Sequence, residues 1–200
     1  YLAIKTAGQA HGIVDFGMRA LLSMRLEKNF PTWFAELRPI YGPFEGAMDR
    51  FVKLQKPDFI GRAAAVAERD AGPRLRRVSL MIEAGDADVL GDEPIWAKVG
   101  ADHGTIEQPH GYGAPRFDAT GQEMPRPDPV RDGDWRVVGW VTSGGYAHWV
   151  QVSMAQGYLP AALAERGEAG LFAVEIMGER RAARIALEPP FDPAGERMRM

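Results

Sequence analysis

The sequence predicts an α+β protein in which a helical first third precedes a β-rich remainder. Apolar residues recur at spacings of three and four within 18–26 and 59–67, which is the period of an amphipathic helix. Beyond Pro73 the period changes to two, as in strands with one buried face. The Gly72-Pro73 pair between these regions is a helix stop. The second part is therefore expected to form a small antiparallel β-barrel or sandwich.

The strand period is found in five segments of the second part. In order along the chain they are 77–82, 135–141, 148–154, 171–176 and 183–187. Asp58 is expected to cap the start of the second helix, because its side chain can accept hydrogen bonds from free backbone N–H groups. The Gly144-Gly145 pair is expected to form a hairpin turn or a bulge.

Residues 99–133 interrupt this pattern with a segment rich in glycine, proline, aspartate and charge. Such a composition favours turns and loops over strands. A connection of this length is uncommon in a compact domain. We expect an interface element or a disordered insertion here more readily than a functional lid.

Composition narrows the class of protein. The 200 residues carry a formal net charge of −3, so no basic excess points to nucleic acid. There is no apolar run of about 18 residues and no leader of the secretory kind, which predicts no membrane association. The expected setting is the bacterial cytoplasm or, as the second choice, the mitochondrial matrix. Because the chain opens on Tyr1 inside an apparent helix, we expect it to be part of a longer polypeptide.

Several kinds of chemistry lack the residues that they need. The absence of cysteine excludes disulfides, thiolate nucleophiles, cysteine-ligated zinc and iron–sulfur clusters. There is no phosphate-binding loop, no G-x-S-x-G elbow and no G-x-G-x-x-G. Asp102, His103 and His110 could hold a metal, but they lie in the irregular segment, where ligands lack support. We therefore predict no metal site.

Arg25 is the most informative single residue. Met18, Leu21, Leu22, Arg25 and Leu26 share one helix face by their spacing, so Arg25 is expected to point inward. A buried guanidinium needs an anion or several acceptors. The spacing leaves two alternatives open: a structural salt bridge, with Glu45 as the free partner, or an anionic or carbonyl-rich ligand.

Aromatic residues gather after this helix. Such a group is more often part of a hydrophobic core than a slot for a flat ligand, but both are built from the same residues. The sequence does not separate these two alternatives. The group consists of Phe30, Trp33, Phe34, Tyr41, Phe44 and Phe51.

Five ordered motifs resemble the C-terminal segments of the glycine-cleavage aminomethyltransferase superfamily. The S-x-R-L-E-K and S-G-G-Y-A-H forms look most like its dimethylglycine and sarcosine dehydrogenase branch. The resemblance covers nearly the whole chain except about 99–133, which looks like an insertion. The motifs are ALLSMRLEKNFPTW (20–33), PFEGAMDRFVKLQKPDFIGRAA (43–64), GDEPIW (91–96), VGWVTSGGYAHWVQVSMAQGYLP (138–160) and EPPFDPAGERMR (188–199).

The resemblance implies an α+β fold in which residues 1–72 finish a ferredoxin-like folate-binding lobe and residues 73–200 form the terminal β-barrel. In that family an N-terminal flavin domain, which carries FAD, oxidises an N-methyl amine. The folate domain then captures the one-carbon unit as 5,10-methylenetetrahydrofolate. The family's catalytic acidic residue falls upstream of the matched motifs. We therefore expect no catalytic residue in this chain and no activity from it alone.

The resemblance also implies which residues contact tetrahydrofolate. The family's folate-contacting arginine matches Arg25, which favours the ligand over the salt bridge. A family contact after the R-L-E motif matches Phe30. Trp33, from the aromatic group, is expected to contact the folate as well. Glu45 matches a recurring glutamate that would orient Arg25. Arg50 is a departure, because the family normally has an aromatic residue there.

Arg50 supports a different class of function. It could stack on a ring or bind a glutamate tail, or it could mark a domain that has altered or lost folate binding. In that case the chain would be a structural or subunit-docking domain, with the 99–133 insertion at an interface and a homo-oligomer as one outcome. The folate domain of a standalone aminomethyltransferase, or of another demethylase, is a further alternative.

Overall fold

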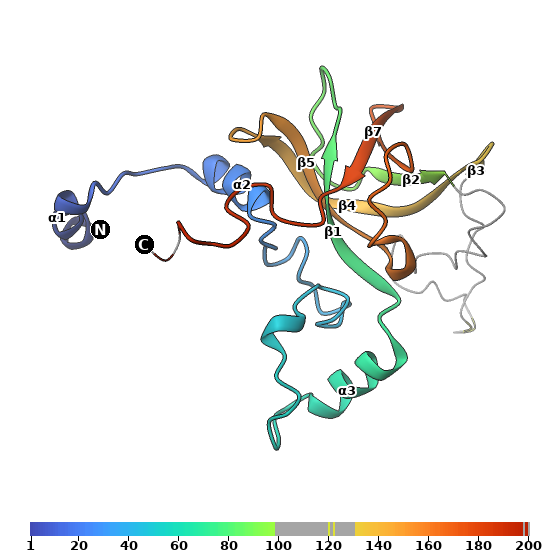
Figure 1. The fold of residues 1–200 in the computed structure, drawn as a ribbon, viewed down its shortest axis with the longest axis horizontal. Coiled ribbons are helices and arrows are strands. Elements are labelled where there is room, and N and C mark those ends of the chain that lie inside the picture. Colours follow the sequence, from blue (N-terminus) through green and yellow to red (C-terminus); the bar gives the residue numbers. More distant parts are fainter. Residues whose placement is uncertain (99–119, 121, 123–130, 198, 200) are drawn as a thin grey trace.

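The second part of the chain forms the strands that its period predicts. The computed structural model describes residues 1–98, 120, 122, 131–197 and 199 (Figure 1). All the strands in these ranges follow Gly72. In chain order they are β1 (Leu75–Ile82), β2 (Pro94–Lys98), β3 (Arg131–Asp132), β4 (Trp135–Ala147), β5 (Val152–Pro160), β6 (Phe172–Ile176) and β7 (Glu179–Ile185).

Six of these strands close into an antiparallel barrel. Neighbouring strands follow the order β2-β6-β7-β1-β5-β4, and β2 pairs with β4 as well, so the sheet returns to its start. The short β3 adds a hairpin to β4. Closure removes the open edges of the sheet, which would otherwise leave backbone groups unpaired. The expected antiparallel barrel is confirmed.

The interior of the barrel is filled by alternate residues of its strands. On β1 the side chains of Val78, Leu80 and Ile82 are buried together, as their alternation predicts. One apolar cluster joins them to Ile95, Ala97, Val138, Val141, Ala155, Leu159, Phe172, Val174, Ile176, Ala183 and Ile185.

The outer face of β1 is also covered, and the candidate site lies there. Arg77 and Ser79 are buried although they alternate with the interior residues. Their cover is the segment between the first helices and the barrel, since Asn29 accepts hydrogen bonds from both side chains and Gly46 accepts one from Arg77. Next to them Leu26 packs against β4 and β5.

Three α-helices precede the barrel: α1 (Leu2–Gly8), α2 (Met18–Glu27) and α3 (Arg62–Ala71). Short 3-10 helices span Gln9–His11, Asp49–Phe51 and Ala161–Leu163. Figure 1 shows α1 standing apart from the barrel, and no residue of α1 is buried. Residues 1–72 thus contain helices and irregular segments, with an isolated bridge between Trp33 and Leu37. None of the helices in the described ranges could cross a bilayer.

The ends of the helices differ from the prediction at one point. The helix expected at 59–67 begins at Arg62, because Gly61 precedes it with a left-handed φ of 86°. The expected cap at Asp58 is therefore wrong. Gly72 ends the helix as predicted, with a φ of 77°.

The strands differ from the prediction in several places, and the strand expected at 183–187 is β7, which runs from Glu179 to Ile185. The segment expected at 148–154 starts as a turn, and β5 begins only at Val152. Gly144 and Gly145 lie within β4, so a hairpin at this pair is wrong, whereas the alternative, a bulge, is matched just before the pair by a register shift between Val141 and Ser143. Strand β2 was not predicted. Most of the expected 99–133 insertion lies outside the described residues, and its end forms β3.

Glycine is required where two barrel strands approach closely. A Cβ atom added to Gly157 on β5 would lie 2.5 Å from the backbone oxygen of Trp140 on β4. We predict that Gly157→Ala lowers the free energy of unfolding by about 3 kcal/mol, because the strands would have to separate. Urea unfolding measures this. Gly167→Ala is the control, since its added carbon meets only ordinary contacts; equal losses in both variants would contradict the account.

Candidate ligand site around the Arg25 and Glu36 ion pair

Helix α2 turns only its last turns toward the barrel. Arg25 is 6% exposed and Leu26 is buried, whereas Met18 is 70% exposed and Leu21 and Leu22 are exposed too. The predicted inward direction of Arg25 is confirmed, but the continuous buried face is not. Ser23 fixes the helix by donating to the carbonyl oxygen of Tyr146 at 2.9 Å.

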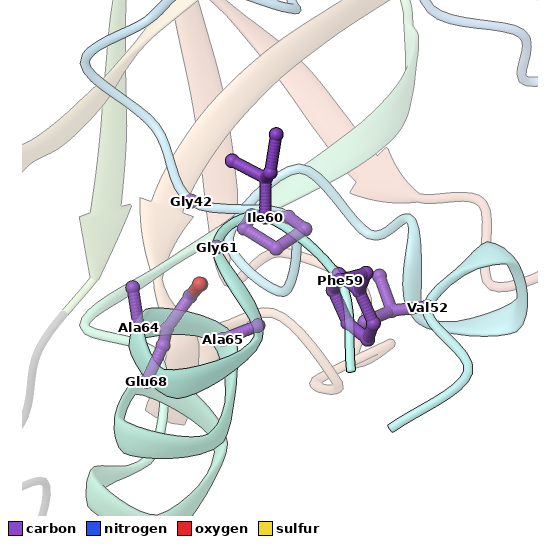
Figure 2. A pocket seen from close by; sticks show the side chains of 9 residues that line it. Gly42, Val52, Phe59, Ile60, Gly61, Ala64, Ala65 and Glu68 are labelled. Carbon is purple, nitrogen blue, oxygen red and sulfur yellow. The ribbon is translucent and has the colours of Figure 1, made fainter. Parts of the chain in front are cut away.

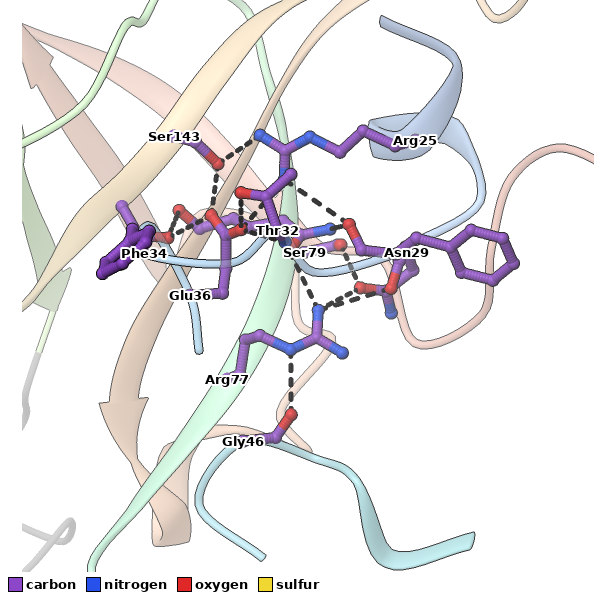
Figure 3. A network of polar contacts seen from close by, with 12 residues as sticks. Arg25, Asn29, Thr32, Phe34, Glu36, Gly46, Arg77, Ser79 and Ser143 are labelled. Atoms are coloured by element: carbon purple, nitrogen blue, oxygen red, sulfur yellow. Dashed lines mark hydrogen bonds and ion pairs between the residues drawn. The ribbon is translucent and has the colours of Figure 1, made fainter. Parts of the chain in front are cut away.

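The buried partner of Arg25 is Glu36. The Arg25 Nη1 atom lies 3.2 Å from Glu36 Oε2, and it also faces the carbonyl oxygen of Phe30 at 3.5 Å. Arg25 Nη2 donates to the Ser143 hydroxyl (Figure 3). The expectation that Glu45 would orient Arg25 is wrong. The Glu45 carboxylate instead forms an ion pair with the Arg74 guanidinium at 3.2 Å, because both residues lie near the start of β1.

Glu36 is fully buried and saturated with hydrogen bonds. Its Oε2 atom accepts from the Thr32 backbone N–H at 2.7 Å and from the Thr32 hydroxyl at 2.8 Å. Its Oε1 atom accepts from the Thr142 hydroxyl at 2.7 Å and from Ser143. The Glu36 backbone oxygen accepts from the Tyr158 hydroxyl at 2.8 Å. One residue thereby ties its own loop to α2, β4 and β5.

These contacts set the charge states of the pair. Burial alone would raise the pKa of Glu36, but the Arg25 charge and the hydrogen bonds from Ser143, Thr32 and Thr142 outweigh it and lower that pKa. Burial lowers the pKa of Arg25, and the neighbouring Glu36 carboxylate opposes the shift. An arginine stays protonated under such a shift. The site therefore holds a charged ion pair at neutral pH.

A second buried arginine extends the network along β1. Arg77 donates from Nε to the Gly46 carbonyl oxygen at 3.0 Å, and from Nη1 to Asn29 Oδ1 at 2.8 Å and Gln156 Oε1 at 3.0 Å. Gln156 Nε2 in turn donates to the Phe30 carbonyl oxygen at 3.1 Å. Burial lowers the pKa of Arg77. The Phe30 carbonyl oxygen thus faces Arg25 directly and is linked to Arg77 through Gln156.

The five predicted folate contacts fall into two groups. Arg25 and Phe30 are adjacent, and the loop with Thr32 and Glu36 continues to Trp33, which is 69% exposed. Glu45 is near this group through its backbone oxygen, which accepts from the Arg77 N–H at 2.8 Å.

Arg50 makes up the second group. Its side chain is exposed, and its guanidinium carbon lies 4.6 Å from the centre of the Phe51 ring. No hydrogen bond or ion pair in the described chain joins it to Arg25 or Glu36.

The aromatic group is mostly not core. Trp33, Phe34 and Phe51 are exposed, while Phe44 is buried and Tyr41 stacks on Tyr158 with ring centres 3.8 Å apart. The sequence left both alternatives, a hydrophobic core and a slot for a flat ligand, open for this group. The difference arises because the segment runs over the outside of the barrel, where only some side chains can reach the wall.

Sequence reasoning missed Glu36, Arg77 and Gln156. The polar side of β1 was a signal for Arg77, although alternation alone places such residues in solvent. Gln156 lies within a strand whose outer face is covered by the same segment. Nothing in the local pattern separates Glu36 from the other charged residues of its loop.

A separate cavity of about 410 Å³ lies between α3 and the chain that precedes it (Figure 2). Its walls are apolar apart from Glu68, whose Oε1 atom accepts from the backbone N–H groups of Phe44 and Glu45 at 3.1 and 3.0 Å. The only charge in its lining is negative, which does not suit an anionic ligand. The described residues contain no group of side chains that could hold a metal, and His103 and His110 lie outside them.

Two protein-family models match this chain. The GCVT N-terminal domain matches residues 1–56, and the glycine cleavage T-protein C-terminal barrel domain matches residues 116–192. The second match coincides with strands of the closed barrel. This chain belongs to the glycine cleavage T-protein family.

Relatives of this T-protein family member include two mitochondrial dehydrogenases. Dimethylglycine dehydrogenase of Mus musculus is 34% identical over 94% of this chain. Sarcosine dehydrogenase of Mus musculus is 30% identical over 100% of it. The chain spans only 18% of the length of either relative.

A solved structure of the family has the same fold. The glycine cleavage system aminomethyltransferase T from Bartonella henselae superposes with a TM-score of 0.62 over 88% of this chain and 39% of that one. The two sequences are 22% identical. The T-protein fold therefore extends beyond the barrel to the segment that covers it.

Removing the charge of Glu36 tests the ion pair. We predict that Glu36→Gln lowers the free energy of unfolding by about 3 kcal/mol near neutral pH, because Arg25 stays charged and loses its counter-charge. A carboxylate with a lowered folded-state pKa stabilises the fold above its unfolded-state pKa and loses this effect as the pH falls. The difference in unfolding free energy between wild type and Glu36→Gln should therefore shrink as the pH falls below 4.5, the ordinary pKa of a glutamate.

Urea unfolding between about pH 7 and about pH 3 measures both effects. Glu165→Gln, at an exposed position, is the matched control and should follow the wild type at every pH. A difference between Glu36→Gln and wild type that does not change with pH would contradict a charged pair.

Proposed function

We propose that this chain is the tetrahydrofolate-binding, one-carbon-accepting module of an oxidative demethylase that acts on N-methyl amines such as dimethylglycine or sarcosine. The observation that carries the proposal is the likeness to both dehydrogenases over nearly the entire chain. Bound tetrahydrofolate would supply the nitrogen atoms that accept the one-carbon unit as 5,10-methylenetetrahydrofolate.

The side chains around the ion pair suit a ligand of this kind, which combines flat rings with carboxylates. Phe30 is half-buried and Trp33 is exposed, so both rings have surface that a ligand can contact. Arg50 supplies an exposed guanidinium that can stack on a ring or bind a carboxylate. Arg25 would support the loop below the ligand instead of contacting the ligand, because both its η nitrogens already donate to protein groups. Glu45 would hold the covering segment in place.

The proposal assigns the oxidation step to FAD in an N-terminal flavin domain or subunit. Exposed apolar side chains on α1, on α2 and between them support a docking surface for a further domain, because clustered exposed apolar residues usually mark contacts. They are Leu2, Ile4, Val14, Phe16, Met18, Leu21, Leu22 and Met24. The full enzyme would work in the bacterial cytoplasm or the mitochondrial matrix, and this chain alone would be inactive.

One observation favours a second candidate, a structural or subunit-docking domain that has altered or lost folate binding. Arg25 is 6% exposed and is satisfied by Glu36, Ser143 and the Phe30 carbonyl, except at Nε. A ligand would have little of this guanidinium to contact. Arg50 in place of the family's aromatic residue adds to this alternative.

Calorimetric titration of the full polypeptide with 5-formyltetrahydrofolate separates the two candidates. We predict saturable binding of one ligand per chain. Arg50→Ala should weaken the binding about tenfold, because a charge-assisted contact is lost.

Arg184→Ala is the matched control, since Arg184 is an exposed arginine on β7. It should bind like the wild type. No saturable binding by a folded wild-type protein would overturn the proposed function and leave the structural domain. Equal affinity of wild type and Arg50→Ala would remove Arg50 from the site.

A further inference from the structure

Two adjacent aromatic side chains are exposed on the loop that carries Glu36. Trp33 is 69% exposed and Phe34 is 71% exposed. Their rings meet edge to face, with centres 5.4 Å apart and planes at 74°. Figure 3 shows Phe34 beside Glu36. Single exposed apolar residues are ordinary, but a rigidly placed pair of large rings needs an explanation.

The backbone of Phe34 is held in an unfavourable conformation. Its φ is 68°, in the left-handed region that glycine favours and bulky residues rarely adopt. A glycine would fit this position without strain. Strain of this kind persists only where the surroundings impose it, and it is concentrated at ligand-binding sites.

The buried ion pair imposes this conformation. Thr32 donates twice to Glu36, and the N–H groups of Glu36 and Leu37 both donate to the Thr32 carbonyl oxygen at 3.2 Å. The Phe34 N–H donates to the Leu37 carbonyl oxygen at 3.3 Å. The loop is therefore closed on itself and fixed to the barrel. Its rings are presented in one arrangement, which lowers the entropy lost when a ligand binds.

A positive charge lies at the edge of this pair. Arg38 is exposed and donates from Nε to the Phe34 carbonyl oxygen at 2.7 Å, which places its guanidinium beside the loop. In the described part of the chain this is the only hydrogen bond of the Arg38 guanidinium, so its η nitrogens can meet a carboxylate. Two rings and one guanidinium suit a conjugated ring that bears an acidic group.

We infer that Trp33, Phe34 and Arg38 form a stacking platform for a planar conjugated ring with an attached carboxylate. Resting on the proposed function, the occupant is the aminobenzoyl-glutamate part of tetrahydrofolate. The platform would hold the distal part of the ligand, while the ion pair beneath fixes the loop. A protein partner that covers the two rings is the competing occupant.

The test titrates the full polypeptide with N-(4-aminobenzoyl)-glutamate and with 5-formyltetrahydrofolate. Trp33→Ala and Arg38→Ala should each weaken the binding of both ligands about tenfold, through the loss of stacking and of the carboxylate contact. Phe34→Gly should weaken binding similarly while it raises the melting temperature by about 2 °C, because the strain is relieved. A gain in stability together with a loss of affinity is not expected of a purely structural residue.

Met177→Ala, which removes another exposed apolar side chain from the β6–β7 turn, is the control and should bind both ligands normally. Wild-type affinity for 5-formyltetrahydrofolate in Trp33→Ala and Phe34→Gly would overturn the platform and leave the proposed function intact. Failure of the wild type to bind either ligand would overturn both. A lower oligomeric mass of Trp33→Ala with unchanged affinity would identify the protein partner instead.

Discussion

Burying the Arg25 guanidinium is the constraint on which the candidate site depends. Removing a charged pair from water carries a desolvation cost that direct attraction offsets only when the remaining polar atoms are satisfied. Here Glu36 is satisfied by Thr32, Thr142 and Ser143 as well as by Arg25. The pair is therefore better understood as fixing geometry than as a source of stability.

The barrel supplies the fixed wall for this geometry. Its interior is an ordinary apolar core, but β1, β4 and β5 direct Arg77, Ser143 and Gln156 outward under the covering segment. The segment cannot shift along the wall without breaking several buried polar contacts, each costly when left unpaired. The same contacts hold the exposed rings of Trp33 and Phe34 in place. A rigid outer face of this kind can serve a ligand or a partner without a conformational change.

The sequence predicts most of this fold and only part of the site. The period of two gives the strands and the Gly72-Pro73 pair gives the boundary, since both follow from local geometry. The inward direction of Arg25 follows from helix spacing in the same way. Its partner does not, because Glu36 reaches Arg25 through a loop whose path is set by tertiary contacts. Glu45 was equally eligible by charge, and only the structure distinguishes the two.

The same limit explains the aromatic group and the closure of the barrel. Burial of Tyr41 and exposure of Trp33 depend on how one irregular segment crosses the barrel wall, which residue type does not reveal. Strand β2 joins β4 and β6 across large separations in sequence, so its pairing has no local signal. The family resemblance anticipated the barrel, while the chemistry of its outer face emerged from the contacts.

A double-mutant cycle on the ion pair tests the central claim most directly. Unfolding free energies of wild type, Arg25→Gln, Glu36→Gln and the double variant give the coupling between the two side chains. If the pair fixes the loop, each single change leaves a buried charge unpaired, and the double variant recovers part of the loss, with a coupling of about 2 kcal/mol or more. Additive losses, with a coupling near zero, would contradict the account.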